Sequence, residues 1–266
     1  MVKLHLCLCK YILLPFGGIA MKWGFFSLTH LFTLVLAAGI TVALYYLLKK
    51  RSAKVQTLVL GILSLSGIFA IVYNLVKWGS PVEYLPLHLC SLNAMVLPFA
   101  VFSRNKTLNN LLLLWSFGAI LAVVVNNAQA DWSIFSTTFA IYYFPHVLEF
   151  AIPVLMFKLK LTEKDVRCAK WTIIITMGAY TLIHLGNLCI NHLLAQHNVL
   201  DWAGNLVQVN YMYSLTPENP VLQLFYNILP LPYWYMYLAV PIIAIYLGLL
   251  YIPQIKLLIK GKSAVS

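Results

Sequence analysis

Residues 31–72 have the sequence LFTLVLAAGITVALYYLL, then KKRSAK, then VQTLVLGILSLSGIFAIV. The two apolar runs, at 31–48 and 55–72, contain no charged residue. A helix needs about 20 mostly apolar residues to cross the hydrocarbon core of a bilayer, so each run is long enough once its apolar flanks are included. The basic link between them is expected to stay outside the lipid. This stretch therefore predicts two membrane-spanning helices joined by a short loop.

The rest of the chain repeats this pattern. Hydrophobic residues make up 62% of the sequence and charged residues only 9%, whereas about one-quarter of a soluble domain is charged. We therefore expect an all-α, polytopic membrane helical bundle over 27–256. An N-terminal extension or interfacial segment is expected at 1–26, and a basic cytoplasmic tail at 257–266. About seven transmembrane helices are predicted, at 27–48, 55–76, 84–103, 107–127, 135–157, 170–193 and 233–255.

The positive charges predict the orientation of these spans. The formal net charge is +11, but Lys and Arg gather at the ends of spans rather than along one face, which argues against a nucleic-acid partner. They concentrate after the first, third and fifth spans and in the C-terminal tail. Because cytoplasmic loops are enriched in Lys and Arg, the N-terminus is predicted outside and the C-terminus in the cytoplasm. The expected location is a cell membrane, as a multi-pass protein of a bacterial plasma membrane.

The longest predicted loop runs from Ala195 to Pro232 on the outer side. It is rich in aromatic residues and contains four prolines. Loops of roughly forty residues within a compact domain usually act as lids or are partly disordered. An apolar, aromatic loop at a membrane surface is expected to re-enter the bilayer or to cap a cavity.

Several polar side chains fall inside the predicted spans, where an ionisable group costs about 2.5–3.5 kcal/mol. At a rise of about 1.5 Å per residue, Cys90, His146 and His184 lie roughly 9, 16 and 13 Å below the outer surface. Each has a polar companion one helical turn away, which is Asn93, Glu149 and Asn187 respectively. These three spans can thus bring reactive groups to similar depths. The same residues could instead form hydrogen bonds between helices.

A thiol and a base in a water-excluded cavity suit acyl transfer. We expect His146 to deprotonate Cys90 while Glu149 orients the imidazole, and a site open to lipid favours a lipid acyl donor. His88 points away from Cys90 by roughly 160° on a helix, so it is the poorer base. Two alternatives for Cys90 stay open, a small buried hydrophobic residue and a disulfide with Cys189.

Four short stretches resemble a known family. The most specific is YLPLHLCSLN at 84–93, and the others are YFPHVL at 143–148, NYMY at 210–213 and PLPYWY at 230–235. Over about 29–255 the sequence resembles the YwaF family of bacterial integral membrane proteins, related to eukaryotic transmembrane protein 164. The resemblance implies a seven-helix membrane protein and a cysteine-dependent phospholipid acyltransferase. It also implies the nucleophile at Cys90 and the intramembrane histidine at His146.

Other polar residues are expected to bind substrate; they are His88, Asn93, His184, Asn187, Asn210 and Tyr211. The expected partners are membrane phospholipids or lysophospholipids, and the oligomeric state is not predicted. No cofactor or metal site is indicated, because the five cysteines form no CxxC pair. The main alternative is a small-solute or proton-coupled transporter, since Glu149, His146 and His184 could relay protons. A lipid hydrolase and a scaffold also remain open.

Overall fold

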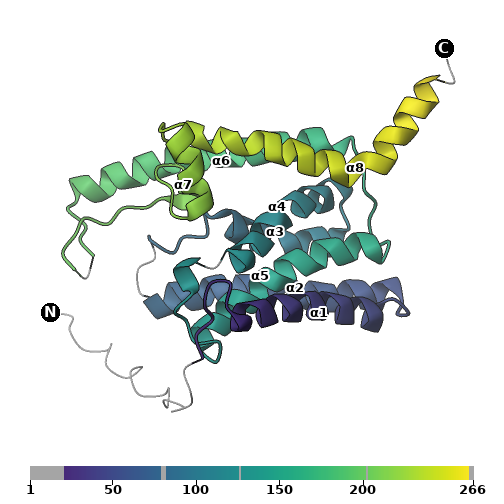
Figure 1. Cartoon of the computed structure of the whole chain (residues 1–266), viewed down its shortest axis with the longest axis horizontal. Coiled ribbons are helices and arrows are strands. Elements are labelled where there is room, and N and C mark those ends of the chain that lie inside the picture. Colours follow the sequence, from purple (N-terminus) through teal and green to yellow (C-terminus); the bar gives the residue numbers. More distant parts are fainter. Residues whose placement is uncertain (1–20, 79–81, 126, 202, 264–266) are drawn as a thin grey trace.

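The computed structural model describes residues 21–78, 82–125, 127–201 and 203–263. Nearly all of its regular structure is helical, as Figure 1 shows, and the predicted all-α bundle is confirmed. In chain order the helices are α1 (Leu28–Leu48), α2 (Ala53–Trp78), α3 (Leu89–Ser103), α4 (Lys106–Val124), α5 (Thr137–Lys158), α6 (Cys168–Gln196), α7 (Pro220–Ile228) and α8 (Ala239–Ser263). Short 3-10 turns are η2 (Asn127–Gln129), η3 (Tyr211–Tyr213) and η4 (Trp234–Leu238).

Six helical segments in the described part of the chain are long and apolar enough to cross a membrane. They are α1, α2, α4, α5, α6 and the segment Trp234–Lys256, which joins η4 to most of α8. The predicted span at 84–103 differs, because only its last 15 residues form the helix α3. Pro86 has no N–H to donate and disfavours helical conformation in the residue before it. Residues 84–88 accordingly lie outside any helix and precede α3 as turns and extended chain.

The helices form layers that place α3 and α4 in the middle of the bundle. In Figure 1, α6 and α8 run along one side and α1, α2 and α5 along the other. Both α3 and α4 pack against α5, and α4 also packs against α6. The main core lies among these helices, with Leu97, Leu112, Ile152 and Met156 fully buried. This packing brings α3 against α5, the two helices that carry Cys90 and His146.

The loop between α5 and α6 is tied to α4 and α8 by buried polar side chains. Asn110 of α4 donates from Nδ2 to the carbonyl oxygen of Glu163 at 3.0 Å. Its Oδ1 accepts from the backbone N–H of Asp165 and from the hydroxyl of Tyr251 on α8. Gln254 of α8 also bonds to the backbone of this loop. These bonds fix the three segments relative to one another at the basic end of the bundle.

The residues just before α1 are fastened to the loop between α4 and α5. Trp23 is fully buried, and its backbone N–H donates to the carbonyl oxygen of Trp132 at 2.8 Å. Its indole N–H donates to the Thr33 hydroxyl at 2.8 Å. Residues 21–26 of the predicted N-terminal extension therefore pack on the bundle, while residues 1–20 lie outside the described residues.

Two other predicted segments contain more helix than expected. The long loop at 195–232 includes η3 and the short helix α7. The predicted basic tail at 257–266 continues α8 as far as Ser263, and residues 264–266 lie outside the described part. Part of each predicted non-helical segment is therefore helical.

Candidate functional site

Cys90 is the second residue of α3, close to the turns that precede this helix. The helix begins after His88, whose extended backbone serves as the N-cap without a side-chain bond. Cys90 is half-buried with a free thiol, and Cys189 on α6 is also free and is exposed. The disulfide that the sequence left open for Cys90 is therefore not formed. A free thiol at the start of α3 remains available for chemistry.

His146 of α5 is held in one ring orientation by its own helix. Its Nδ1 lies 2.6 Å from the carbonyl oxygen of Tyr142, one turn earlier. A carbonyl oxygen can only accept, so Nδ1 carries the proton and Nε2 keeps its lone pair in the neutral ring. The two rings also pack together, with centroids 4.3 Å apart. The tautomer of His146 is thus the one that a general base acting through Nε2 requires.

Glu149 and Asn93 form a buried polar pair between α5 and α3. Asn93 is fully buried and Glu149 is 4% exposed. The Nδ2 of Asn93 lies 3.5 Å from the backbone oxygen of Glu149, at the limit for a hydrogen bond. Among the described residues, Asn93 Oδ1 and Glu149 Oε2 have no hydrogen-bond partner. Buried polar atoms are nearly always bonded, so two unbonded oxygens in one place are unusual.

The thiol, the imidazole and the carboxyl gather in one region. Glu149 interacts electrostatically with both His146 and Cys90, and Tyr142 interacts with Cys90 and Glu149. We call Cys90, Asn93, Tyr142, His146 and Glu149 the α3–α5 cluster. The bond that orients His146 comes from the Tyr142 backbone, so the role expected of Glu149 as orienting residue falls to the main chain. Glu149 remains close enough to balance positive charge on the ring.

The polar residues predicted on α6 serve another purpose. Asn187 donates to the Tyr211 carbonyl oxygen at 2.8 Å and accepts from the Tyr211 N–H at 3.0 Å. Asn191 forms the same paired contact with Val209, at 2.9 and 2.7 Å. His184 bonds through Nδ1 to the Ser214 hydroxyl at 3.0 Å. We call His184, Asn187 and Asn191 the α6 stripe; it fastens the loop between α6 and α7 to the bundle.

The remaining predicted binding residues lie in or against that loop. Asn210 is bonded within the loop, to the Thr216 hydroxyl at 2.9 Å and the Glu218 carboxylate at 2.7 Å. Tyr211 is 1% exposed and packs in an apolar cluster with residues of α6. The Nδ1 of His88 accepts from the Met212 N–H at 3.3 Å. The contact of His88 with Met212 places this loop against the start of α3.

Two tyrosines near Cys90 were not among the predicted site residues. Tyr142 and Tyr213 both interact electrostatically with Cys90, and the hydroxyl of Tyr142 donates to the Ala122 carbonyl oxygen at 3.0 Å. Helical spacing could have found Tyr142, because it lies one turn before His146. Tyr213 comes from the loop, where residue spacing gives no comparable signal.

The side chains present define the chemistry that the site can support. Within the described ranges, no three His, Cys, Asp or Glu side chains come together as metal ligands. The α3–α5 cluster offers a thiol, an imidazole base, a carboxyl and a phenol. These groups can transfer protons and form a covalent bond to an acyl group.

A comparison with known families matches residues 25–251 to the TMEM164 family. The match extends from before α1 to Tyr251 in α8 and includes the whole α3–α5 cluster. No curated protein and no solved structure matches the chain. The expected relation to transmembrane protein 164 is confirmed, while the bacterial YwaF assignment stays a prediction. The chain belongs to the TMEM164 family and is a polytopic membrane protein.

Proposed function

We propose that this TMEM164-family protein transfers acyl chains between membrane lipids through a thioester on Cys90. The observation that carries the proposal is the bond from His146 Nδ1 to the Tyr142 carbonyl oxygen, which leaves Nε2 as a base. The electrostatic interaction of Glu149 with both Cys90 and His146 supports it. A thiol with a nearby imidazole is the arrangement that nucleophilic acyl transfer needs.

In the first half-reaction, the Cys90 thiol gives its proton to His146 Nε2. The sulfur attacks the ester carbonyl carbon of a phospholipid, and the carbon–sulfur bond forms. The ester carbon–oxygen bond then breaks, and the departing lysophospholipid oxygen takes the proton from His146. The imidazolium present between these steps carries one positive charge, which Glu149 and the Tyr142 carbonyl oxygen are placed to stabilise.

In the second half-reaction, the hydroxyl of an acceptor lysophospholipid gives its proton to His146. Its oxygen attacks the thioester, the carbon–sulfur bond breaks, and the thiolate recovers the proton. One ester is exchanged for another, so no oxidant, cofactor or energy source is needed. Water as acceptor would make the same site a lipid hydrolase. The buried position of Asn93 beside Glu149 suits a residue that positions substrate.

The proposal includes a topology. With α3 as a short seventh crossing, the N-terminus lies outside and the C-terminus in the cytoplasm, which places the basic loops inside. The α3–α5 cluster then lies in the outer half of a cell membrane, under the loop that caps α3. A bacterial plasma membrane is the proposed location.

The test is covalent labelling of the purified protein in lipid with a thiol-reactive acyl-lipid probe. We expect labelling of the wild type, none for Cys90→Ala, and undiminished labelling for Cys189→Ala, which removes an exposed free thiol. A phospholipid with a radiolabelled acyl chain should then give a hydroxylamine-sensitive adduct with the same dependence. Equal lipid turnover by Cys90→Ala and wild type would contradict the proposal.

A proton-coupled transporter is a second candidate, favoured by the buried Glu149 carboxyl with an unbonded oxygen. Ionisable groups within membrane spans commonly relay protons. In that case Cys90→Ser should retain activity, while Glu149→Gln should abolish proton movement in reconstituted vesicles. The acyltransferase predicts the opposite for Cys90→Ser, because the covalent intermediate is lost.

A further inference from the structure

A second site lies at the other end of α5, away from the α3–α5 cluster. A cavity of about 830 Å³ opens between α4, α5, the α5–α6 loop and α8. The second half of α5 lines it, from Phe150 to Lys158. Lys158 follows His146 by twelve residues on the same helix, or roughly 18 Å along its axis. Its volume is within the range of roughly 300–1,000 Å³ that is typical of small-molecule sites. The cavity is therefore large enough for part of a lipid.

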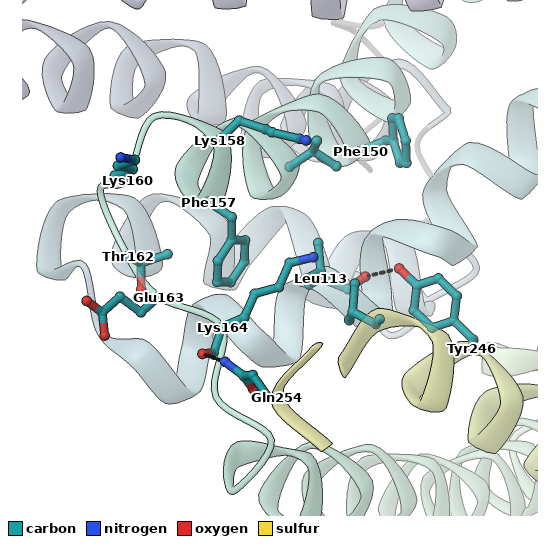
Figure 2. Close-up of a pocket in the computed structure, with 12 residues that line it drawn as sticks. Leu113, Phe150, Phe157, Lys158, Lys160, Thr162, Glu163, Lys164, Tyr246 and Gln254 are labelled. Carbon is teal, nitrogen blue, oxygen red and sulfur yellow. Dashed lines mark hydrogen bonds between the residues drawn. The ribbon is translucent and has the colours of Figure 1, made fainter. Parts of the chain in front are cut away.

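One part of the cavity wall is apolar. It is lined by Phe150 and Phe157 of α5 and by Tyr246 and Leu250 of α8. Figure 2 shows the rings of Phe150, Phe157 and Tyr246 around it. The Tyr246 hydroxyl donates to the Leu113 carbonyl oxygen at 2.9 Å, so this ring is held in place. These side chains come from helices with membrane-spanning composition. A lipid acyl chain that lies along this wall stays in contact with apolar side chains.

The other part of the wall is basic. Lys158, Lys160 and Lys164 all line the cavity, and Figure 2 shows Lys158 and Lys164 reaching into it from opposite sides. Burial and the nearby Lys158 ammonium lower the pKa of Lys164. Glu163 is the one carboxylate in the lining. In the described part of the chain, none of the three lysines forms an ion pair, and Asp165 nearby is paired with Lys106 and Arg167.

We propose that this cavity binds an anionic phospholipid, with its phosphate between Lys158 and Lys164 and an acyl chain along Phe150, Tyr246 and Leu250. Lysines that repel one another in a cavity are stabilised by an anion placed between them. Basic pockets between membrane helices are suited to anionic lipid headgroups. The site is separate from the α3–α5 cluster and does not depend on the proposed acyl transfer.

Hydrogen bonds hold the wall of the cavity together. Gln254 bonds to the backbone of Lys164 and Val166, which fixes α8 against the loop that carries the lysines. Asn110 fastens the same loop to α4. The lipid would therefore meet a preorganised site, which lowers the ordering cost of binding.

The test measures lipid binding by native mass spectrometry of the purified full chain. Phosphatidylglycerol and phosphatidylcholine with identical acyl chains are titrated against wild type and against Lys158→Gln/Lys164→Gln. The matched control is Lys50→Gln/Lys54→Gln, which removes two exposed lysines outside the cavity. We expect wild type and control to bind phosphatidylglycerol about tenfold or more tightly than phosphatidylcholine, and the cavity variant to lose this preference.

Two further experiments distinguish binding of a phospholipid from binding of a free phosphate compound. Leu250→Trp fills the apolar wall and should weaken phosphatidylglycerol binding while the lysines remain. Glycerol phosphate, which has no acyl chain, should not compete at concentrations that saturate with lipid. Equal binding of the two lipids by wild type, equal loss in the control variant, or full competition by glycerol phosphate would each overturn the proposal.

Discussion

Asn93 and Asn187 are both fully buried in helices, yet their surroundings differ. Asn187 in the α6 stripe donates to the Tyr211 carbonyl oxygen and the Ser214 hydroxyl, and it accepts from the Tyr211 N–H. Asn93 in the α3–α5 cluster has a long contact with the Glu149 backbone oxygen and an interaction with the Glu149 carboxyl, and its Oδ1 has no partner among the described residues. The side chain of Asn187 is fully hydrogen-bonded within the fold, whereas Asn93 still has an oxygen that can accept a hydrogen bond.

This difference separates two uses of polar residues in membrane helices. Both regions show the same sequence pattern, a polar residue with a companion one turn away. In the α6 stripe the companions bond to a loop, which is a structural task. In the α3–α5 cluster the companions face one another with unbonded oxygens, as expected where a substrate or water completes the bonding. The number of satisfied bonds, and not the pattern, distinguishes them.

The largest expected effect is on the rate of acyl-probe labelling, which should depend on His146 and not on His184. His146→Ala should lower the rate of acyl-probe labelling by about 10²–10⁴-fold, because it removes the proposed general base. His184→Ala, in the α6 stripe, should leave the labelling rate of folded protein within a few-fold of wild type. The measurement is single-turnover labelling of each purified variant. Similar losses in both variants would erase the distinction between the regions.

The next prediction concerns the free energy of unfolding, which should fall more for a substitution in the α6 stripe than for one in the α3–α5 cluster. Asn187→Ala should lower the free energy of unfolding by about 3 kcal/mol, because the buried Tyr211 N–H and carbonyl oxygen lose their partners. Asn93→Ala leaves fewer groups unpaired and should cost less than about 1 kcal/mol. Thermal unfolding in detergent, with exposed Asn227→Ala as control, measures both. A larger loss for Asn93→Ala would show that the cluster is itself structural.

A third prediction tests how closely α2 confines the cluster. A methyl group at Gly67 would lie 2.6 Å from the Ala94 Cβ and 3.0 Å from Glu149 Oε1. Gly67→Ala should therefore destabilise the protein by about 1–3 kcal/mol through overpacking. Gly178→Ala on α6 meets nothing within 4 Å and serves as the matched control. Equal unfolding temperatures for the two variants would mean that the helices can separate at no cost.

The smallest effect concerns a carboxylate whose bonding is complete. Hydrogen bonds from Arg167 and Lys106 lower the pKa of Asp165, which lies in the α5–α6 loop. The folded pKa is below the unfolded value of about 3.9, so the stabilisation is full above that pH and is lost as pH falls through the folded pKa. Asp165→Asn should lower the unfolding temperature slightly at pH 7. The difference should shrink below about pH 4, and a difference that grows on acidification would contradict this assignment.

The sequence predicted the helical membrane architecture well, because long apolar runs have few other uses. The depths of Cys90 and His146 stay predictions, and the residue count for Cys90 assumed a helix at 84–88 that the structure does not contain. What spacing could not predict was the rotation of α6, which turns Asn187 toward the loop instead of toward Cys90. It also could not predict the shortening of α3, which begins only after the turns around Pro86, or the contribution of Tyr213 from a loop.

The basic cavity shows a second limit of sequence patterns. Lys158, Lys160 and Lys164 count equally as orientation signals under the positive-inside rule. Only the packing of α8 against the α5–α6 loop turns two of them toward a shared space. A charge count along the chain has no information on which lysines face one another.

The attachment of Trp23 also has a consequence for how the protein is made. Its backbone partner Trp132 lies in the loop between α4 and α5, so this contact cannot form until α4 and the loop after it have been synthesised. Helices enter the membrane in order of synthesis, and α1 must therefore wait in the bilayer through three further insertions. A chain stalled before the α4–α5 loop would therefore expose the segment around Trp23 without its partner.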